Sequence, residues 1–489
     1  MPDLRACREA GHPTVAVCAA NDVGGLFTEM ADEVVLLNGE SIGETYLDQE
    51  QIIKAALQTG ATAVHPGFGF LSERADFATA VDAAGLTWIG PSAMAIEKMG
   101  DKMTARQTMR AAGVPVIPGE EVEEEDEATA LEALRQASER VGYPLLLKAS
   151  SGGGGKGMRA VHGPSEFDQA AAGARREAIA AFGDGRVYIE RLLSGSKHVE
   201  IQVLADQHGR TIHLGERECS VQRRHQKVFE EAPGPTMTDE LREAMGQAAV
   251  AAAEAVNYVG AGTVEFLLAP SGEFFFLEMN TRIQVEHPVT ELVTGVDIVR
   301  EQLRIAAGEP MSCGRLMMRG HAIEVRLYAE DAVNGFLPSI GPLAVFRPPE
   351  GPGIRLDTGV REGDEVTPDY DPMLAKLIVW APSRVEALEK MRRALDEFIV
   401  LGTTTNIEFL RDLCDAQPVV NGTTTTTTID DVWPSGWNPP SSPVLEEAAL
   451  LAAASAETLG LHRTQTGTAS VSSENGPVSP FNTLSRRYP

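Results

Sequence analysis

Three stretches of the sequence concentrate side chains that could do chemistry. The first, 148–158, reads Lys-Ala-Ser-Ser-Gly-Gly-Gly-Gly-Lys-Gly-Met and follows an apolar, strand-like run at 145–147. Glycines let backbone N–H groups approach phosphate oxygens without obstruction by Cβ atoms, and Lys148 and Lys156 add positive charge. Gly157 stands where a Walker A loop has Ser or Thr, so this is a different motif. The stretch indicates a phosphate-binding loop, with a flexible linker as the alternative.

The second stretch, 276–288, alternates polar with apolar residues, and an extended chain would place its polar members on one face. The oxygens of two members suit Mg²⁺, and Glu265 on the apolar run 262–268 could add a second carboxylate. The series also offers a guanidinium fork for a small oxyanion and a carboxylate that could act as a base. The alternative is an exposed edge strand. The polar members are Glu278, Asn280, Arg282, Gln284 and Glu286.

The third stretch, 217–233, gathers arginines, His225 and Lys227 within a very acidic chain. Neighbouring glutamates make a structural ion-pair network as plausible as a functional cluster, and the residues alone leave both open. We interpret Cys219 within it as a packed core thiol.

The elements that must position these residues differ along the chain. Apolar runs at 13–20, 33–37 and 61–67, with helical stretches such as 48–59 between them, predict a parallel sheet. Ligands gather at the carboxyl ends of such strands, where 65–73 falls. Residues 120–127 predict an acidic helix start. Further on, the patterns predict strands at 322–327, 341–346 and 375–380, a helix at 384–398, a linker at 433–443, a helix at 442–461 and a disordered end.

Composition narrows the class of protein. The length of 489 residues suggests about three domains, and the formal charge of −28 argues against a nucleic-acid partner. No apolar run reaches the roughly 18 residues of a membrane span, and the start lacks a signal peptide. The five cysteines are scattered without a CxxC pair, which argues against a zinc site or a disulfide framework. We therefore expect a cytoplasmic protein.

With these residues assembled, the sequence resembles biotin carboxylases of the ATP-grasp superfamily from about residue 4 to about 430. The motifs are HPGFGFLSE, MGDK, the glycine loop, KHVEIQVLAD, QRRHQKVFEEAP, EMNTRIQVEHPVTE, RGHAIEVRL and FLPS. The resemblance implies an α/β and α+β fold of consecutive parts. These are a truncated parallel-sheet N-terminal domain (1–90) lacking its first strand, an ATP-grasp domain (91–310) with a lid at about 120–190, a mixed α+β C-terminal domain (315–435), and a linker-like helix with a disordered tail (436–489).

The same resemblance implies roles for individual residues. Lys102 and Lys148 would contact phosphates, with Gly154 and Gly155 closing over the nucleotide. Four residues would form the adenine hinge, namely Glu190, Arg191, Leu192 and Leu193, and three more would contact the nucleotide, namely His198, Gln222 and His225. Glu265 and Glu278 would bind the magnesium of the ATP complex, and Asn280 a second ion. The bicarbonate pocket would comprise Lys227, Arg282, Gln284 and the Val285 backbone, with Glu286 as the base, while Arg326 would steady the biotin enolate.

The implied activity is the first half-reaction of an acyl-CoA carboxylase, in which an ATP-dependent ligase carboxylates biotin with bicarbonate through carboxyphosphate. Its cofactors would be ATP, Mg²⁺ or Mn²⁺, and biotin. The sequence has no Ala-Met-Lys-Met attachment motif, so biotin would arrive on a separate biotin carboxyl carrier protein, and a carboxyltransferase subunit would complete the complex. A homodimer is expected, with Arg5 and Arg355 at interface positions.

Some features depart from the family pattern. Members open with a strand, a glycine turn and part of a helix before the segment that resembles 4–11, so we expect Met1 to lie inside a longer reading frame. Phe68 replaces a tyrosine, and Ser151 replaces the first glycine of the loop. Two alternatives to the carboxylase interpretation are another bicarbonate-using ATP-grasp ligase, such as half of a carbamoyl-phosphate synthetase, and a catalytically silent scaffold subunit.

Overall fold

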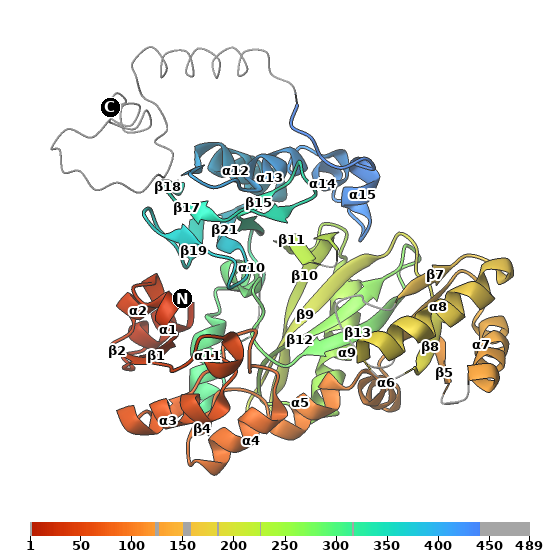
Figure 1. The fold of residues 1–489 in the computed structure, drawn as a ribbon, viewed down its shortest axis with the longest axis horizontal. Coiled ribbons are helices and arrows are strands. Elements are labelled where there is room, and N and C mark those ends of the chain that lie inside the picture. Colours follow the sequence, from red (N-terminus) through yellow and green to blue (C-terminus); the bar gives the residue numbers. More distant parts are fainter. Residues whose placement is uncertain are drawn as a thin grey trace. The chain divides into compact units, whose positions relative to one another are not determined.

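An antiparallel sheet of eight strands forms the centre of the fold, in the order β13-β12-β9-β10-β11-β14-β21-β19. The pairing of β11 with β14 joins segments that are far apart in the sequence into one continuous sheet (Figure 1). The strands are β9 (Lys197–Ala205), β10 (Thr211–Arg223), β11 (Gln226–Ala232), β12 (Gly260–Leu268), β13 (Phe274–Asn280), β14 (His321–Tyr328), β19 (Ile354–Thr358) and β21 (Met373–Ala381).

The coordinates come from a computed structural model. The chain divides into a compact unit, Met1–Trp437, and a second unit, Asn438–Pro489. The structure describes residues 2–122, 127–149, 158–182, 185–224, 226–314 and 317–440. The predicted helix at 442–461 and the predicted disordered end lie outside these residues, as do Ser151, Lys156 and the rest of the glycine loop.

Helices cover the large sheet because its strands carry apolar side chains toward them. α9 (Asp239–Glu254) packs on β9, β10 and β12, and its Met245 and Ala249 join Val264 and Phe266 in one buried cluster. α12 (Arg384–Glu397) packs on β14 and β21 in another cluster, and it confirms the helix predicted at 384–398. The other helices around the sheet are α5 (Ala93–Gly100), α6 (Lys102–Ala111), α10 (His287–Thr294) and α11 (Ile298–Ala306).

The N-terminal strands are parallel, as their spacing predicts. β1 (Val15–Cys18) pairs with β2 (Glu33–Leu36), and β3 (Ala63–Val64) pairs with β4 (Thr87–Trp88). Within the described residues these pairs are two separate two-stranded sheets. The helices beside them are α1 (Pro2–Glu9), α2 (Leu26–Met30), α3 (Gln49–Thr59) and α4 (Ala75–Ala83). The predicted helix at 48–59 is therefore α3, with Asp48 capping its N-terminus.

A smaller antiparallel sheet has the order β5-β8-β6-β7 and packs against α7 (Glu127–Val141) and α8 (Pro164–Phe182). It appears beyond α6 in Figure 1. The helix start predicted at 120–127 is wrong for its first residues, because 119–122 form a strand that pairs with β8 and buries Val122. The strands are β5 (Gly119–Val122), β6 (Leu145–Ala149), β7 (Arg159–Val161) and β8 (Val187–Arg191).

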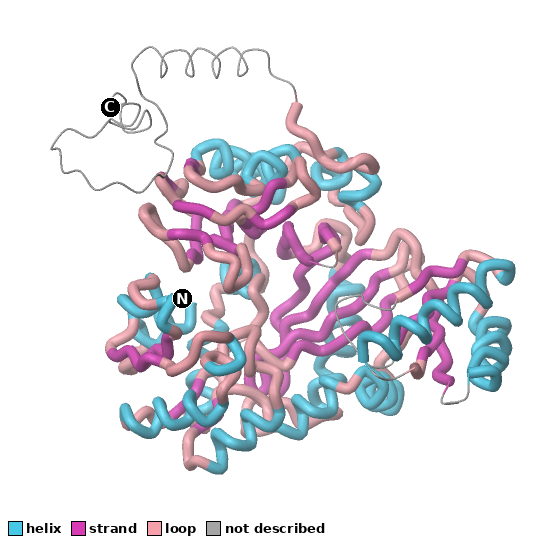
Figure 2. Tube along the Cα trace, viewed as in Figure 1, coloured by secondary structure: helices cyan, strands magenta, loops and turns pink. Residues whose placement is uncertain are grey.

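The C-terminal part of the compact unit contains short strands and helices, which alternate closely along the chain in Figure 2. The strand predicted at 341–346 is divided into β17 and β18, because these two pieces pair with different partners, β20 and β22. The elements are β15 (Glu330–Asp331), β16 (Leu337–Pro338), β17 (Gly341–Pro342), β18 (Val345–Arg347), β20 (Glu365–Val366), β22 (Ile399–Leu401), α13 (Ile407–Leu413), α14 (Gln417–Asn421) and α15 (Thr428–Val432).

The linker predicted from 433 onward is wrong as far as Trp437. The Trp433 and Trp437 rings lie 5.4 and 5.9 Å from the buried Phe409 ring, and Trp437 Nε1 donates to Asp412 at 2.9 Å. Aromatic burial thus holds a segment that its Pro, Gly and Ser content would otherwise leave free. In the threonine run before it, Thr424 Oγ1 donates to the buried Glu218 at 2.6 Å.

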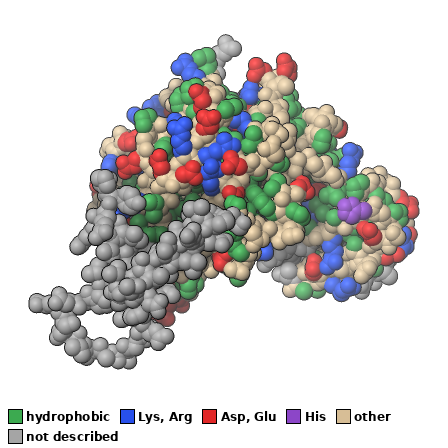
Figure 3. Space-filling model, turned by 90° about the horizontal axis from the view of Figure 1, so that it is seen from above, with side chains coloured by type: hydrophobic (Ala, Val, Ile, Leu, Met, Phe, Trp, Pro, Cys, Tyr) green, Lys and Arg blue, Asp and Glu red, His purple; other side chains and the backbone are tan. Residues whose placement is uncertain are grey.

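The surface shown in Figure 3 intersperses acidic, basic and apolar side chains. In the described ranges, no helix combines the length and the apolar character needed to cross a membrane.

Candidate active site

The floor of the candidate site is a buried ion pair between neighbouring strands of the large sheet. Arg217 on β10 is fully buried, and its Nε donates to Glu200 on β9 at 2.5 Å. Its other nitrogens donate to three oxygens, on Gln202, Thr263 and Thr290, at 2.8 to 3.1 Å. Burial alone would lower the pKa of Arg217, but the carboxylates of Glu200 and Glu286 raise it. The guanidinium is therefore a permanent cation beneath the site, and each of its three nitrogens donates at least one hydrogen bond.

Lys227 on β11 lies above this floor and collects three carboxylates. Its Nζ donates to Glu200 at 2.5 Å, to Glu265 at 2.8 Å and to Glu286 at 2.7 Å. An ammonium group has three N–H donors, so all of them are used here. Burial would lower the pKa of Lys227, but the three carboxylates raise it well above its usual value. The structure thus brings together Lys227, Glu265 and Glu286, which the sequence analysis had assigned to one site.

Glu286 is held between two cations. Its second oxygen accepts from Arg326 Nη2 at 3.0 Å, while Arg326 Nε donates to Glu230 at 2.7 Å. Glu286 has no exposed surface. Burial would raise the pKa of this carboxyl, but Lys227 and Arg326 hold it well below its usual range. The proposed base is therefore ionised, and it lies within hydrogen-bond reach of both cations that would face substrate.

A hydrogen-bonded network of two amides and a guanidinium borders the carboxylate of Glu265. Arg282 donates through Nη2 to Asn280 at 3.1 Å, through Nη1 to Gln284 at 2.8 Å, and through Nε to Glu73 at 2.9 Å. Asn280 and Gln284 in turn donate to the same oxygen of Glu265 at 2.8 and 3.0 Å. Arg282 is thereby oriented by partners on several sides, which prepares its fork for an oxyanion.

Glu265 and Glu278 are the predicted magnesium ligands, and the structure makes them direct cross-strand partners on β12 and β13. The side chain of Glu278 is exposed to solvent. Surrounding protein atoms and the charge of Glu265 nevertheless raise its pKa, and Lys102 lowers it in part. Two facing carboxylates that repel each other fit a divalent cation, which would remove the repulsion. Asn280 fits less directly, because its oxygen accepts from Arg282 and its nitrogen faces Glu265. Its amide would have to turn to become a ligand.

The described residues predicted to contact the nucleotide lie on strands of the large sheet and on or just after strands of the smaller sheet, except Lys102, which begins α6. On β9, His198 Nδ1 lies 2.6 Å from Nε2 of Gln222 on β10. The other ring nitrogen of His198, Nε2, lies 2.7 Å from Glu265 Oε2. Lys148 on β6 forms an ion pair with the buried Glu190 on β8, which also accepts from Arg106 at 2.9 Å. These residues form two groups, the first of which touches the carboxylate cluster. His225, Gly154 and Gly155 lie outside the described residues.

The predicted adenine hinge continues from Glu190 at the end of β8. The backbone N–H groups of Arg191 and Leu192 donate to the carbonyls of Pro118 at 2.9 Å and Pro144 at 3.0 Å. Leu193 carries a carbonyl that accepts from Ser196 at 3.1 Å. The hinge is thus pinned to the segments on both sides of it.

The extended chain considered for 276–288 holds only as far as Asn280. β13 ends there, the chain turns, and Glu286 immediately precedes α10, which has proline in its first turn. Glu286 reaches Lys227 because of that turn, since a straight strand would carry it away from Glu265. Cys219 is fully buried and burial raises its pKa well above the usual value, in agreement with a packed thiol.

Several residues at this site were not assigned a role from the sequence. Glu200 could have been found, because His198, Glu200 and Gln202 alternate with apolar residues in the strand pattern of KHVEIQ. Glu73 ends the motif that follows a predicted parallel strand, where ligands were expected. Glu230 and Lys376, which donates to the Val285 carbonyl at 2.6 Å, come from segments that only the strand pairing places here.

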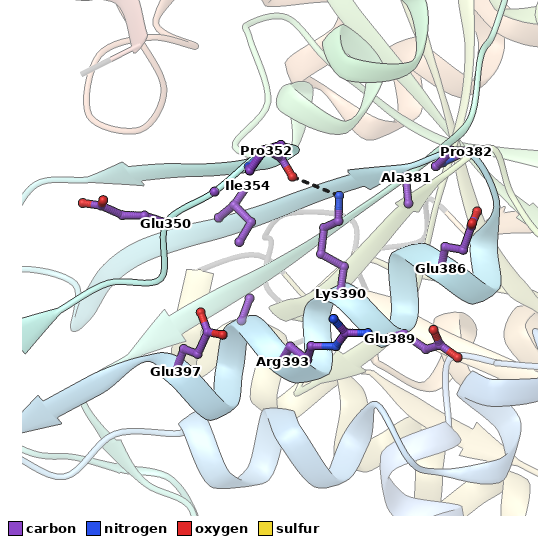
Figure 4. A pocket seen from close by; sticks show the side chains of 12 residues that line it. Glu350, Pro352, Ile354, Ala381, Pro382, Glu386, Glu389, Lys390, Arg393 and Glu397 are labelled. Atoms are coloured by element: carbon purple, nitrogen blue, oxygen red, sulfur yellow. Dashed lines mark hydrogen bonds between the residues drawn. The ribbon is translucent and has the colours of Figure 1, made fainter.

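A surface pocket beside α12 is separate from this cluster in its lining residues. It is bordered by charged side chains that include Glu350, Glu386 and Arg393, and Lys390 donates there to the Pro352 carbonyl at 3.0 Å (Figure 4). None of the predicted site residues lines it.

Comparison with known proteins identifies the family. The chain is 48% identical over 431 residues to a biotin carboxylase of Nostoc sp., covering 88% of this chain and 96% of that protein. The chain belongs to the biotin carboxylase family. It is also 50% identical over 414 residues to the mitochondrial methylcrotonoyl-CoA carboxylase subunit alpha of Oryza sativa subsp. japonica, covering 84% of this chain but 56% of that longer protein.

Three family models match successive parts of the chain. Residues 3–96 match the biotin carboxylase N-terminal domain, 101–313 the ATP-binding domain of the carbamoyl-phosphate synthase L chain, and 324–431 the biotin carboxylase C-terminal domain. The chain is thus a ligase of the ATP-grasp type, from a family that uses ATP, Mg²⁺ and biotin.

Solved biotin carboxylases share the fold. A β-γ-ATP complex from Campylobacter jejuni is 38% identical with a TM-score of 0.83, covering 88% of this chain and 96% of that one. The biotin carboxylase domain dimer of the Hydrogenobacter thermophilus 2-oxoglutarate carboxylase, in complex with MgADP and bicarbonate, is 43% identical with a TM-score of 0.83, covering 88% and 94%. The predicted biotin carboxylase fold is therefore confirmed.

The buried floor predicts a large effect of removing its cation. We expect Arg217→Met to lower the free energy of unfolding by about 3–5 kcal/mol, because Glu200 would lose one of its two cations inside the protein. Urea unfolding followed by circular dichroism measures this change. Arg74→Met is the control, since Arg74 and Asp76 form an exposed pair that contributes about 1 kcal/mol or less. Equal effects of the two substitutions would contradict the structural role of Arg217.

The facing carboxylates predict where the metal binds. We expect Glu278→Gln to weaken Mn²⁺ binding in the presence of ADP by at least about tenfold, or about 1.4 kcal/mol, because one anionic ligand is lost. Without metal, the same variant should be no less stable than the original protein, since it relieves repulsion from Glu265. Titration calorimetry and thermal unfolding measure the two effects. Glu273→Gln, at an exposed position just before β13, should change neither, and unaltered Mn²⁺ binding in Glu278→Gln would remove Glu278 from the ligand set.

Proposed function

We propose that this chain carboxylates biotin on a separate carrier protein, using ATP, a divalent metal and bicarbonate. The observation that carries the proposal is the convergence of two cations, Lys227 and Arg326, on the carboxylate of Glu286. Lys227 also bonds to Glu265, and Arg282 is linked to Glu265 through Gln284. This arrangement offers a base, cationic groups for a small oxyanion and two facing carboxylates for a metal within one connected network. Sequence similarity to biotin carboxylases along nearly the whole of a relative supports it.

Bicarbonate would bind between Arg282, Lys227 and the peptide of Val285, with Gln284 orienting the guanidinium. Lys376 holds the Val285 carbonyl and so fixes this peptide. Glu286 would take the bicarbonate proton, and the resulting oxygen would attack the γ-phosphorus of ATP, forming carboxyphosphate and releasing ADP. Phosphoryl transfer depends mainly on positioning and charge neutralisation. Lys102 and Lys148 would supply positive charge here, and a metal held by Glu265 and Glu278 would neutralise phosphate charge.

The second step transfers carbon dioxide to biotin. Carboxyphosphate would break its C–O bond to give CO₂ and phosphate, and the phosphate would take the proton from the ureido nitrogen of biotin. That nitrogen would then attack CO₂. The negative charge that develops on the ureido oxygen needs a fixed cation. Arg326 is suited to this role, because Glu230 and Glu286 hold its guanidinium in place.

Other subunits would complete the carboxylase to which this chain belongs. Relatives include subunits named for methylcrotonoyl-CoA, propionyl-CoA and pyruvate carboxylases, so the step they share with this chain would be biotin carboxylation. We propose that a biotin carboxyl carrier protein delivers the biotin and that a carboxyltransferase subunit selects the acyl-CoA. A homodimer is also proposed, by likeness to the Hydrogenobacter domain dimer. Arg5 and Arg355, expected at its interface, both bond to Asp357 within this chain. Five free thiols favour a reducing compartment such as the cytoplasm.

The activity test separates this function from its alternatives. Bicarbonate-dependent ADP release should be stimulated by free biotin and not by ammonia. Stimulation by ammonia alone would indicate a carbamoyl-phosphate type of ligase. No ATP cleavage with any acceptor would indicate a scaffold subunit.

The central cluster predicts which substitutions abolish activity. We expect Lys227→Ala, and separately Glu286→Ala, to lower biotin-dependent kcat by at least about 100-fold, because a cation for bicarbonate or its base is removed. A coupled assay of ADP release measures the change, and circular dichroism checks that the fold is retained. Lys54→Ala, an exposed position on α3, should retain full activity. Full activity in both cluster variants would refute the assigned roles.

A further inference from the structure

Behind Arg326, two buried glutamates face each other across neighbouring strands. Glu230 on β11 and Glu324 on β14 are direct partners in the antiparallel register. Residues directly opposite each other in such a pair project their side chains from the same face of the sheet, with Cβ atoms about 5 Å apart. Both residues are 0% exposed. The two carboxyl groups therefore occupy one small region that water does not reach from the surface.

The hydrogen bonds of this pair are incomplete. Glu230 Oε1 accepts from Arg326 Nε at 2.7 Å, but Glu230 Oε2 has no partner among the described residues. Neither oxygen of Glu324 has a partner there. An ionised carboxylate that is buried without donors costs several kcal/mol, whereas a protonated carboxyl can itself donate one hydrogen bond.

The surroundings also disfavour two negative charges. Ala322, Ile378 and two valines of α10 form an apolar cluster on the side of Glu324 away from Arg326. The charged groups that face the pair are Glu286 before α10, Arg326 on β14, Lys227 on β11 and Lys376 on β21. Each of these cations already bonds to another group: Lys227 and Arg326 bond to Glu286, and Lys376 bonds to the Val285 carbonyl.

Titration behaviour agrees with this geometry. Burial raises the pKa of Glu324 well above its usual value, since Lys376 offsets only part of that effect and Glu230 adds to it. Burial also raises the pKa of Glu230, to about 7, despite the nearby Arg326. Two carboxyls that share one site lose their protons in separate steps, and the second loss is strongly disfavoured.

We propose that Glu230 and Glu324 share one proton and that the resulting singly charged pair positions Arg326 for biotin. The proton would reside mainly on Glu324 and be donated to the free Oε2 of Glu230. The pair then presents one negative charge to Arg326 Nε, which leaves the Nη groups directed at Glu286 and the substrate oxyanion. Loss of the shared proton would place a second negative charge behind the guanidinium and draw it into the sheet. The positioning role rests on the proposed function, whereas the shared proton does not.

A pH profile tests the positioning role. Glu324→Gln keeps a neutral hydrogen-bond donor beside Glu230, so it mimics the protonated pair but cannot lose a proton. At low pH the native pair takes up a second proton and is neutral, and at intermediate pH it holds one proton and carries a charge of minus one. It loses this shared proton as pH rises further, so native biotin-dependent kcat/KM should fall on the alkaline side. In Glu324→Gln this fall should move to higher pH by at least about one unit, with activity near neutral pH within about threefold of native. Superimposable profiles would overturn the proposal.

Glu231→Gln is the matched control for Glu324→Gln. Glu231 follows Glu230 on β11 and is buried like Glu324. Unlike those of Glu324, its oxygens have hydrogen-bond partners, since they accept from His321 at 2.7 Å and from Arg384 at 2.7 and 3.0 Å. Its replacement should lower stability without moving the alkaline limb of the profile. A shift of the same size in Glu231→Gln would mean that the effect is general loss of packing, and the proposal would be wrong.

Infrared difference spectroscopy tests the shared proton without relying on activity. At pH 7 the native protein should show the C=O stretching band of a protonated carboxyl that is missing from Glu324→Gln and still present in Glu231→Gln. A native spectrum with carboxylate bands alone at this position would overturn the proposal. If the band is present but no biotin-dependent activity is found, the proposed function fails while the proton-sharing pair stands.

Discussion

One ammonium group, that of Lys227, bonds to three carboxylates that come from three parts of the chain. Glu200 and Glu265 lie on β9 and β12, and Glu286 lies in the turn before α10. In a weakly polar interior these anions would repel one another strongly without a shared cation. Arg217 beneath and Arg326 beside them complete the compensation. The site therefore depends on cations placed before any substrate arrives, which is also what chemistry on a bicarbonate oxyanion requires.

The continuous sheet explains how these charges are supplied. β11 pairs with β10 on one side and with β14 on the other, so Lys227 and Arg326 reach Glu286 from adjacent strands. The same pairing puts Glu324 opposite Glu230. Arg326 therefore lies near three carboxyl groups, those of Glu230, Glu286 and Glu324, which is more negative charge than one guanidinium can neutralise. A proton shared by Glu230 and Glu324 would remove one of these negative charges. The register of β11 with β14 therefore determines both the positions of the cations and the net charge around them.

Much of the fold followed from sequence pattern. Residue patterns predicted helices at 48–59 and 384–398 and strands at 322–327 and 375–380, which are α3, α12, β14 and β21, and the ordered motifs predicted the family. Errors occurred where tertiary contacts decide local structure. Residues 119–122 form a strand because β8 is available to pair with them, and Trp437 is held by Phe409 despite linker-like neighbours. Asn280 ends β13 because the chain must turn to bring Glu286 back toward Lys227.

The sequence alone determined the chemical inventory: which carboxylates, amides and cations the site could use, and the family that combines them in this order. Residue types and spacing carry that information because each group's chemistry is local. Tertiary structure decided which of these groups touch. The triple contact of Lys227, the role of Glu73 in orienting Arg282 and the Glu230–Glu324 pair depend on strand register and on turns between distant segments. Such long-range contacts are set by packing of the whole sheet, and no local pattern encodes them.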